Sequence, residues 1–509
     1  MHLTLIQPPA LMAVDSYSAI TQPPLGIAYL AAYAREQGHE VHIVDAVGDA
    51  VTRVRPWPHR AKRLLQGLDV AETVARVPRD TEVIGVSCMF THSWPMVRGL
   101  LKALEEAFPA AWLIAGGEHV TALPEQVLAQ TSVDACVLGE GEHTLADLLE
   151  AFASEETDLA TVPGIAYRRD DGSIALTARR QRIRDVDRLP LPAWDLVDPM
   201  AYQAGEVFMG PKGGRSIPML ATRGCPYRCA FCASPHMWTQ LWRPRSPERI
   251  VDEMQTYMSR WGADDFQFQD LTMIVRRDWI VALCREIITR KLDIRWSLPV
   301  GTRAEAVDRE VAGLLLASGC RHVTFAPESA SPRILAAVEK RATIERVERT
   351  VNDCLEAGLQ VCLFMIVGFP DEQAADTRAT LRWLRRMAWR GTHEVAVSTF
   401  VPLPGTRIYE DLQRTSPFEV DDEFCHWMTG ATSLLTVRSW NQRLGARRLL
   451  LLKLWSMVSF YGIAFLRRPR RLVRLAVNAL TGRQETKVDR VVREFLVKVR
   501  SLLPGRRAG

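Results

Sequence analysis

The chain has 509 residues, of which 47% are hydrophobic and 24% are charged. This globular composition excludes a disordered chain or a coiled coil, and the length has room for two or three domains of roughly 100–200 residues each. The net charge of +5 is too small to indicate a nucleic-acid binder, and it hides an asymmetry. Residues 440–509 carry +14, whereas the preceding residues carry −9, so the basic tail is expected to have a partner of its own, but not nucleic acid.

The amino terminus and the cysteines predict a cytoplasmic protein. The short run Leu3–Ile6 is followed directly by Gln7-Pro8-Pro9, with no basic segment before it, which is not typical of an export signal. Seven of the ten cysteines lie singly in apolar stretches, as buried thiols do. Because disulfide scaffolds are dense in cysteine, this pattern favours a reducing compartment.

Residues 1–150 predict a doubly wound parallel sheet. Apolar strands, each followed by a turn and a helix, are expected at residues 3–6, 41–44, 83–87, 112–115 and 135–138. Ligands bind such sheets beyond the carboxyl ends of the strands. The segments found there are Thr91-His92-Ser93, Gly116-Gly117-Glu118-His119 and Gly139-Glu140-Gly141-Glu142, whose glycines would let the backbone approach a bulky ligand or simply form ordinary turns.

Residues 151–210 are interpreted as a connector, and the strand–helix alternation restarts in residues 211–415. Strands are expected at residues 219–222, 265–268, 294–298, 322–325, 361–367 and 395–398. Five or six strand–helix units predict a partial (β/α)6 barrel of the TIM type rather than a closed eight-stranded one. Residues 416–509 predict a helical, basic carboxyl-terminal region.

Three cysteines follow the first of these strands at C-x3-C-x2-C spacing. Cys225, Cys229 and Cys232 share one short loop, so their thiolates can converge on one metal centre. An iron–sulfur cluster held by three cysteines has one open iron, which a small molecule can chelate. Structural zinc is the alternative and would need a fourth ligand, for which His236 is the nearest candidate.

This loop, with Arg223-Gly224 before it and Phe231 inside it, resembles the signature of radical S-adenosylmethionine (SAM) enzymes. The resemblance implies that Cys225, Cys229 and Cys232 hold a [4Fe-4S] cluster whose open iron binds SAM. It continues through Asp270, Arg303 and Glu328, which follow or end successive strands where that family places SAM contacts.

The first domain is similar to the cobalamin-binding domain that precedes the barrel in one large class of these enzymes. The similarity implies cobalamin contacts, and the residues that it assigns to them are Gly116, Gly117, His119, Gly139, Glu140 and Gly141. The D-x-H-x-x-G motif, whose histidine ligates cobalt in many cobalamin proteins, is absent. His92 and His119 are therefore not assigned as cobalt ligands.

The resemblance implies a radical SAM C-methyltransferase that uses cobalamin. Hopanoid C-3 methylases resemble this layout, which implies an unactivated carbon of a hydrophobic, polycyclic lipid as the target, and an electron donor such as flavodoxin or ferredoxin. Two alternatives remain open: an oxidative cyclase of the anaerobic magnesium-protoporphyrin monomethyl ester type, and a cofactor-binding protein without catalysis.

The basic tail has an apolar run at Leu449–Phe465, broken by Lys453 and followed by Arg467-Arg468-Pro469-Arg470-Arg471. The run is at the short limit for a membrane span. Arginines interleaved with leucines predict peripheral contact with the inner face of the membrane through residues 449–475, or alternatively a helical cap on the barrel.

Overall fold

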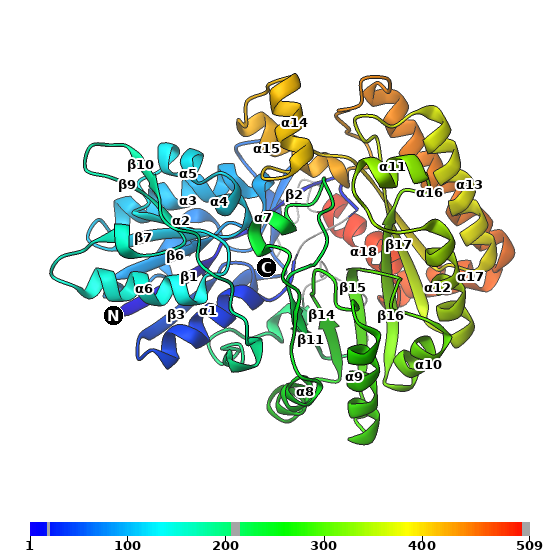
Figure 1. Cartoon of the computed structure of the whole chain (residues 1–509), viewed down its shortest axis with the longest axis horizontal. Coiled ribbons are helices and arrows are strands. Elements are labelled where there is room, and N and C mark those ends of the chain that lie inside the picture. The colour runs from blue at the N-terminus through cyan, green and yellow to red at the C-terminus, as the bar shows by residue number, and fades with distance from the viewer. Residues whose placement is uncertain (18–20, 205–213, 501–509) are drawn as a thin grey trace.

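The computed structural model describes residues 1–17, 21–204 and 214–500, and the predicted connector–barrel boundary at residues 210 and 211 lies outside them. Two α/β lobes stand side by side, each built on its own sheet (Figure 1). The carboxyl-terminal helices extend the second lobe and return toward the first.

The first lobe contains a seven-stranded sheet with the order β10-β9-β8-β7-β6-β1-β3. The predicted parallel strands are confirmed, since the pairs from β3 through β1, β6 and β7 to β8 are parallel. The two strands β9 and β10 lie within the predicted connector and extend the sheet by antiparallel pairing. The strand bounds are β1 (His2–Gln7), β3 (Glu40–Asp45), β6 (Val83–Ser87), β7 (Trp112–Gly116), β8 (Ala135–Val137), β9 (Ile165–Arg168) and β10 (Ile174–Leu176).

Helices cover both faces of this sheet, as expected for a doubly wound fold (Figure 1). α1 buries its alanine-rich face, including Ala28 and Ala31, against the core that contains β1 and β3. α3 buries Leu100, Leu101 and Leu104 in a second core against the other face. The helix bounds are α1 (Leu25–Glu36), α2 (Val70–Ala75), α3 (Trp94–Ala107), α4 (Glu118–Ala122), α5 (Pro124–Gln130) and α6 (Glu142–Ala153).

Two small antiparallel sheets were not predicted. The first has the order β2-β5-β4 and is made of β2 (Ala10–Ala13), β4 (Val54–Pro56) and β5 (Arg63–Gln66). The second pairs β12 (Thr222–Arg223) with β13 (Arg243–Pro244). These strands have two to four residues each, too few for an apolar or alternating pattern to stand out.

The second lobe is a parallel six-stranded sheet with the sequential order β11-β14-β15-β16-β17-β18, which confirms the partial barrel. The strands are β11 (Ser216–Met219), β14 (Asp265–Phe268), β15 (Arg295–Thr302), β16 (Cys320–Glu328), β17 (Gln360–Val367) and β18 (Glu394–Thr399). The connecting helices are α7 (Ser234–Trp238), α8 (Pro247–Trp261), α9 (Arg277–Thr289), α10 (Arg309–Ala317), α11 (Pro332–Ala337), α12 (Ile344–Ala357) and α13 (Ala374–Arg390).

The first barrel strand ends earlier than predicted. The sequence places a strand at residues 219–222, but β11 ends at Met219. The Asp270 carboxylate accepts hydrogen bonds from the backbone N–H groups of Ala221 and Thr222, at 3.2 and 2.5 Å. These N–H groups are therefore diverted from a strand ladder, and the chain turns into the β12–β13 hairpin.

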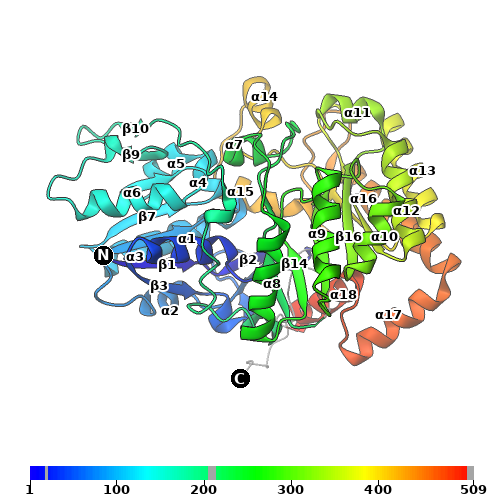
Figure 2. The ribbon, with the colours of Figure 1, turned by 60° about the horizontal axis from the view of Figure 1, so that its bottom comes forward.

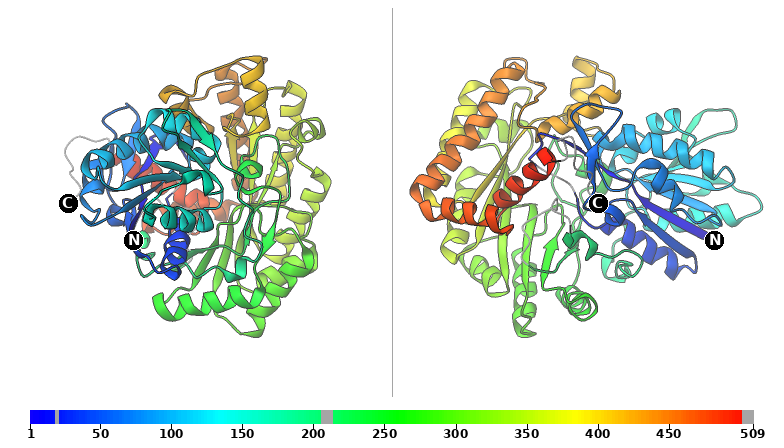
Figure 3. Two further views of the ribbon diagram at one scale, coloured as in Figure 1. Left: turned by 60° about the vertical axis from the view of Figure 1, so that its left-hand side comes forward. Right: turned by 180° about the vertical axis from the view of Figure 1, so that it is seen from behind.

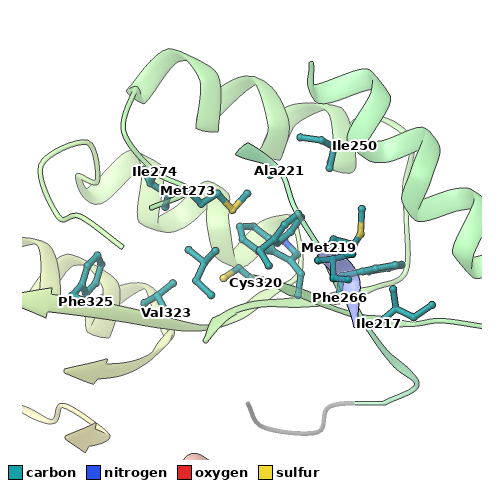
Figure 4. Close-up of a cluster of buried hydrophobic side chains, with 14 of the residues drawn as sticks. Ile217, Met219, Ala221, Ile250, Phe266, Met273, Ile274, Cys320, Val323 and Phe325 are labelled. Carbon is teal, nitrogen blue, oxygen red and sulfur yellow. The ribbon is translucent and has the colours of Figure 1, made fainter. Parts of the chain in front are cut away.

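The barrel core is apolar and closely packed (Figure 4). Ile217 and Met219 from β11, Phe266 from β14 and Val323 and Phe325 from β16 are almost completely buried. Burial of such side chains contributes roughly 1.5–3 kcal/mol each. This core makes the barrel a firm support for the loops at the carboxyl ends of its strands.

The carboxyl-terminal region is helical, as predicted, and consists of α14 (Arg407–Thr415), α15 (Asp422–Met428), α16 (Ala446–Arg467), α17 (Pro469–Thr481) and α18 (Lys487–Arg500). α16 lies against α13 and β18, where the Tyr461 hydroxyl donates to the Val395 carbonyl at 3.0 Å. α17 extends from the rim of the barrel (Figure 2). α18, drawn in red, lies between the two lobes when the molecule is seen from behind (Figure 3, right).

Candidate active site between the two lobes

A cavity of about 520 Å³ lies between the lobes. On one side it is bounded by the turns that follow β1, β6, β7 and β8, where a doubly wound sheet binds its ligands. On the other side it reaches Thr222, Arg223 and Gly224, at the root of the cysteine loop. Part of a third wall comes from Met428, at the end of α15, and from Thr429, Ala431 and Thr432 after it.

The predicted glycine turns line this cavity, namely Gly116, Gly117, Gly139 and Gly141, together with Glu140. Gly117 has a φ of +114°, and a Cβ atom there would stand 2.6 Å from the Cys88 carbonyl oxygen. Only glycine fits this position without moving the backbone. A wall made of backbone at such turns suits a flat, bulky cofactor such as cobalamin.

His119 lies behind the wall and is not among the residues that line the cavity. It is buried, its Nδ1 atom is 3.2 Å from the Thr91 hydroxyl, and its ring centroid is 4.8 Å from that of Trp94. Burial lowers the pKa of His119 to about 3, so the ring is neutral. The His119 ring therefore packs on Trp94 and Thr91 inside the first lobe and does not face the cavity.

Glu140 and Glu142 hold two arginines in a buried arrangement that we call the interdomain ion network (Glu140, Glu142, Arg223 and Arg243). Arg223 reaches Glu142 Oε1 with Nη2 at 2.6 Å and Glu140 Oε1 with Nη1 at 3.3 Å. Arg243 Nη1 lies 2.7 Å from Glu140 Oε2. Burial alone would raise the pKa of Glu142, but the Arg223 guanidinium outweighs it and holds that pKa below its usual value.

Glu140, which the sequence assigned to cobalamin contacts, uses its carboxylate within this network. Its carboxylate oxygens are engaged by the two arginines and by the Ile183 N–H group. Arg223 immediately precedes the cysteine loop, so the network joins the predicted cobalamin turn to the predicted cluster loop.

The three clustered cysteines lie on the loop between β12 and α7 and are partly exposed, unlike the seven other cysteines, which are buried. The Cys232 N–H group donates to the Cys229 carbonyl at 3.0 Å, which folds the loop back on itself. Burial raises the pKa of all three thiols, to about 12 for Cys232. Lys340 and Arg303 oppose this rise at Cys225 and Cys229, and positive charges there would stabilise thiolates that bind a cluster.

Arg303 and Glu328 gather beside this loop. The Arg303 guanidinium stacks 3.8 Å from the Tyr227 ring and pairs with Glu305 at 2.9 Å. Its Nη1 atom is buried and has no hydrogen-bond partner in the part of the chain that the structure describes. Glu328, at the end of β16 with a φ of +68°, pairs with Lys340 at 3.0 Å.

Asp270 has a different place. Besides the two backbone bonds described above, it accepts a hydrogen bond from the Thr222 hydroxyl at 2.6 Å. Burial raises the pKa of Asp270 to about 6, although these donors favour its ionised form. The carboxylate is thus committed to the β11–β12 turn, and it supports the cysteine loop instead of facing a ligand.

The residues present fit the predicted cofactors. Buried polar atoms without partners in the described segments include Gln269 Nε2 and Thr272 Oγ1, which follow β14, and Arg303 Nη1, which follows β15, all beyond the carboxyl ends of these strands. Buried polar groups are almost always hydrogen-bonded, so these donors indicate a polar ligand such as SAM. His236 is directed elsewhere, since its Nε2 atom lies 3.1 Å from the Thr121 carbonyl of the first lobe.

Sequence reasoning did not single out Arg223, Arg243, Glu142, Lys340 or Glu118 as site residues. Arg223, Arg243 and Glu142 belong to buried ion pairs whose partners lie 81 to 103 residues away in the sequence, and such pairings leave no local motif. Lys340 pairs with Glu328, twelve residues before it, across the end of β16. Glu118 lines the cavity, and burial raises the pKa of its carboxyl group to about 7. Its negative charge is felt at Cys232, and its place in the quoted Gly-Gly-Glu-His segment was the available signal.

Comparison with known proteins agrees with this geometry. Residues 219–384 match the model of the radical SAM superfamily, and residues 16–149 match that of the B12 binding domain. An uncharacterized methyltransferase of Pyrococcus horikoshii is 29% identical over 81% of this chain and 83% of its own length. Cytidylyl-2-hydroxyethylphosphonate methyltransferase of Streptomyces wedmorensis is 29% identical over 68% of this chain and 69% of its own. The anaerobic magnesium-protoporphyrin IX monomethyl ester cyclase of Cereibacter sphaeroides is 28% identical over 77% and 60%.

Two solved structures share the fold. The cobalamin-dependent radical SAM enzyme OxsB, with aqua-cobalamin and SAM bound, covers 98% of this chain and 79% of its own with a TM-score of 0.69 and 14% identity. The radical SAM methyltransferase TsrM of Kitasatospora setae, with cobalamin and a [4Fe-4S] cluster bound, covers 81% and 78% with a TM-score of 0.61 and 19% identity. The chain therefore belongs to the radical SAM enzymes that carry an amino-terminal cobalamin-binding domain, and it is a cobalamin-dependent radical SAM methyltransferase with SAM, a [4Fe-4S] cluster and cobalamin as its cofactors.

Proposed function

We propose that the enzyme methylates an unactivated carbon of a hydrophobic, polycyclic lipid of the hopanoid type. The observation that carries the proposal is the cavity shared by the two lobes, which reaches from the glycine turns of the first sheet to the root of the cysteine loop. A substrate in this cavity would lie between the glycine turns predicted to bind cobalamin and the cysteine loop predicted to bind the cluster.

The cofactors, when bound, supply a radical that removes hydrogen from carbon and a methyl group that replaces it. The protein's own residues orient the cofactors and the substrate and enclose them. Cys225, Cys229 and Cys232 would hold the cluster, and the unpartnered Nη1 of Arg303 is placed to meet a carboxylate or hydroxyl of SAM. No acid or base is needed at the target carbon.

The lining of the cavity supports a hydrophobic substrate. The wall includes Leu11, Met12, Met89, Phe90 and Leu271, and the last three of these side chains are exposed. Apolar surface of this kind favours an apolar ligand. A flavodoxin or ferredoxin is proposed as the electron donor, and the cytoplasm as the compartment.

The second candidate is an oxidative ring closure on a tetrapyrrole. It is favoured by the 28% identity with the anaerobic magnesium-protoporphyrin cyclase. Both reactions would use the same cofactors, so the product distinguishes them.

The test is anaerobic incubation of the reconstituted enzyme with a reductant, SAM labelled with deuterium in its methyl group, and candidate substrates. Methyl transfer to a hopanoid gives a product that carries the three deuterium atoms of the label. An unlabelled tetrapyrrole with a new ring would replace the proposal by the cyclase activity. If a phosphonate or a tetrapyrrole is methylated while hopanoids and sterol-like lipids are not, the lipid proposal is wrong and the methyltransferase assignment stands.

A further inference from the structure

The carboxyl-terminal helices expose an unusual amount of apolar surface. Twenty large hydrophobic side chains are exposed in the described part of the chain, and eleven of them lie on α16, α17 and α18. These helices make up about a tenth of the chain. Single exposed leucines are normal, but such a concentration marks an interaction surface.

α17 is amphipathic, but its apolar side chains are exposed and its polar side packs on the protein. Its exposed sector carries Leu472, Val473, Val477 and Leu480, at helical spacing. The opposite side carries Asn478, which is buried and donates to Asp489 on α18 at 3.1 Å. The apolar sector therefore faces away from the protein.

α16 repeats this arrangement over its whole length. One stripe, which contains Leu449, Lys453 and Phe460, is buried against the barrel. The opposite stripe is exposed and apolar and consists of Leu451, Trp455, Val458 and Leu466. By length and composition α16 could cross a membrane, but Lys453 donates to the Ala431 and Ser433 carbonyls and Tyr461 to that of Val395, so its inner side is tied to the barrel.

The exposed charges of this region are mostly positive. Asp489 and Glu494 are buried, at 5% and 1% exposure, as are the basic Lys453 and Lys498. Glu485, in the loop between α17 and α18, is exposed and lies 3.9 Å from Arg474. Arg467 and Arg470 are exposed, and Arg470 and Arg474 stand on the border of the α17 apolar sector. Two further arginines, Arg468 and Arg471, are occupied with the carbonyls at the end of α13 and are not available to a partner.

α16, α17 and α18 lie on the same side of the molecule (Figure 3, right). α18 adds Phe495, Leu496 and Val499 to the exposed set. We define the C-terminal apolar face as the exposed apolar side chains of α16, α17 and α18. It presents leucines, valines and a tryptophan beside arginines, and two of the three acids on or between these helices, Asp489 and Glu494, are buried.

We propose that the C-terminal apolar face rests on an anionic lipid bilayer, with α17 lying in the plane of the interface. Apolar side chains beside arginines match the boundary between acyl chains and anionic headgroups. A protein partner would meet the apolar residues equally well, but the excess of exposed arginines (Arg467, Arg470 and Arg474) over the single exposed acid of this region, Glu485, favours a surface that is uniformly negative. The proposal does not depend on the substrate proposed above.

The experiment is flotation of the full-length holoenzyme with vesicles of phosphatidylcholine alone or mixed with phosphatidylglycerol. Binding to the mixed vesicles, and release by high salt, are expected. The Arg470→Gln, Arg474→Gln double variant should bind about thirtyfold more weakly, because it removes two basic residues, and each one near an anionic surface contributes roughly 1 kcal/mol. The control is Arg285→Gln, Arg309→Gln, two exposed arginines of the barrel helices, which should bind like the wild type.

A matched pair of leucine variants tests the apolar contribution to vesicle binding. Leu472 is 51% exposed and Leu176, on β10 of the first lobe, is 56% exposed. Leu472→Glu should lose most vesicle binding while melting at the wild-type temperature, and Leu176→Glu should keep it. Flotation of Leu472→Glu at the wild-type level overturns the proposal. The proposal is also wrong if the holoenzyme does not bind mixed vesicles and instead forms a dimer that the Leu472→Glu substitution dissociates. A second copy of the chain would then cover the C-terminal apolar face.

Discussion

Arg223 Nη2 and Glu142 Oε1 lie 2.6 Å apart, and both side chains are buried. One belongs to the barrel and precedes the cysteine loop, whereas the other begins α6 of the first lobe. The pair therefore fixes the spacing between the two cofactor turns.

Removing one partner of this pair should be costly. Arg223→Gln leaves the Glu142 charge buried without its partner, for which we expect a loss of about 3–5 kcal/mol in the free energy of unfolding. Urea denaturation followed by circular dichroism measures it. Arg35→Gln, which breaks the exposed pair with Asp195, should cost less than about 1 kcal/mol. If Arg223→Gln with Glu142→Gln is as unstable as the sum of the single variants, the pair does not act as a unit.

The iron–sulfur cluster and cobalamin should bind independently of each other, the first at the cysteine loop and the second at the cavity. Cys229→Ala is expected to lose the cluster, because two thiolates remain, and to keep cobalamin, because the glycine turns are unchanged. Iron and sulfide analysis and the cobalamin absorption bands check this. Cys354→Ala, a buried thiol on α12, should retain both. Purified protein that holds zinc and no iron would contradict the assignment of the loop.

Gly117→Ala should weaken cobalamin binding. The added methyl group would stand 2.6 Å from the Cys88 carbonyl oxygen, so the turn that lines the cavity must move. Gly172→Ala is the control, because Gly172 also has a positive φ, of +81°, but open space around its Cβ position. Gel filtration with cobalamin, read by absorbance, should show depleted cofactor for Gly117→Ala alone. Equal depletion in both variants would mean that backbone strain, and not the cavity wall, is responsible.

Lys453 should make stability depend on pH. Burial lowers its pKa from 10.5 to about 7, so between these values the unfolded chain binds the extra proton. The free energy of unfolding should then rise with pH across this window, by at most about 1.4 kcal/mol per unit. Urea unfolding at pH 7, 8 and 9 should show a smaller slope for Lys453→Met than for the wild type. Lys102→Met, at an exposed position, should leave the slope unchanged, and an unchanged slope in Lys453→Met would refute the assignment.

Much of the fold could be predicted because its parallel strands are continuous apolar runs. β17 begins within one residue of the predicted bound for this reason, and β14, whose Asp-Phe-Gln-Phe sequence alternates polar and apolar residues, has the predicted bounds. The shift of β11 could not be predicted, since it depends on the Asp270 carboxylate, which arrives from another strand. β9 and β10 pair at the edge of the sheet, where the alternation of buried and exposed residues is too short to detect.

The candidate site also has parts that could be predicted from the sequence and parts that could not. The cysteine loop and the glycine turns have local patterns, and the structure brings the root of the loop and the turns to one cavity. The roles of His119 and Asp270 depend on which direction each side chain takes from its turn. Both are directed into the protein, where Thr91 and Thr222 contact them. Sequence spacing contains no information on that choice.

α18 has a consequence for the order in which the enzyme is assembled. Lys487 at its start donates to the Pro299 carbonyl of β15 at 2.8 Å, and Lys498 near its end donates to the Ser16 carbonyl of the first lobe at 2.7 Å. The first lobe can fold while the ribosome is still making the barrel. This tie between the lobes, however, uses residues that leave the ribosome after every strand of both sheets. The interdomain ion network, whose residues lie between 140 and 243, can therefore join the lobes first, and α18 adds its tie after the strands of both sheets have been made.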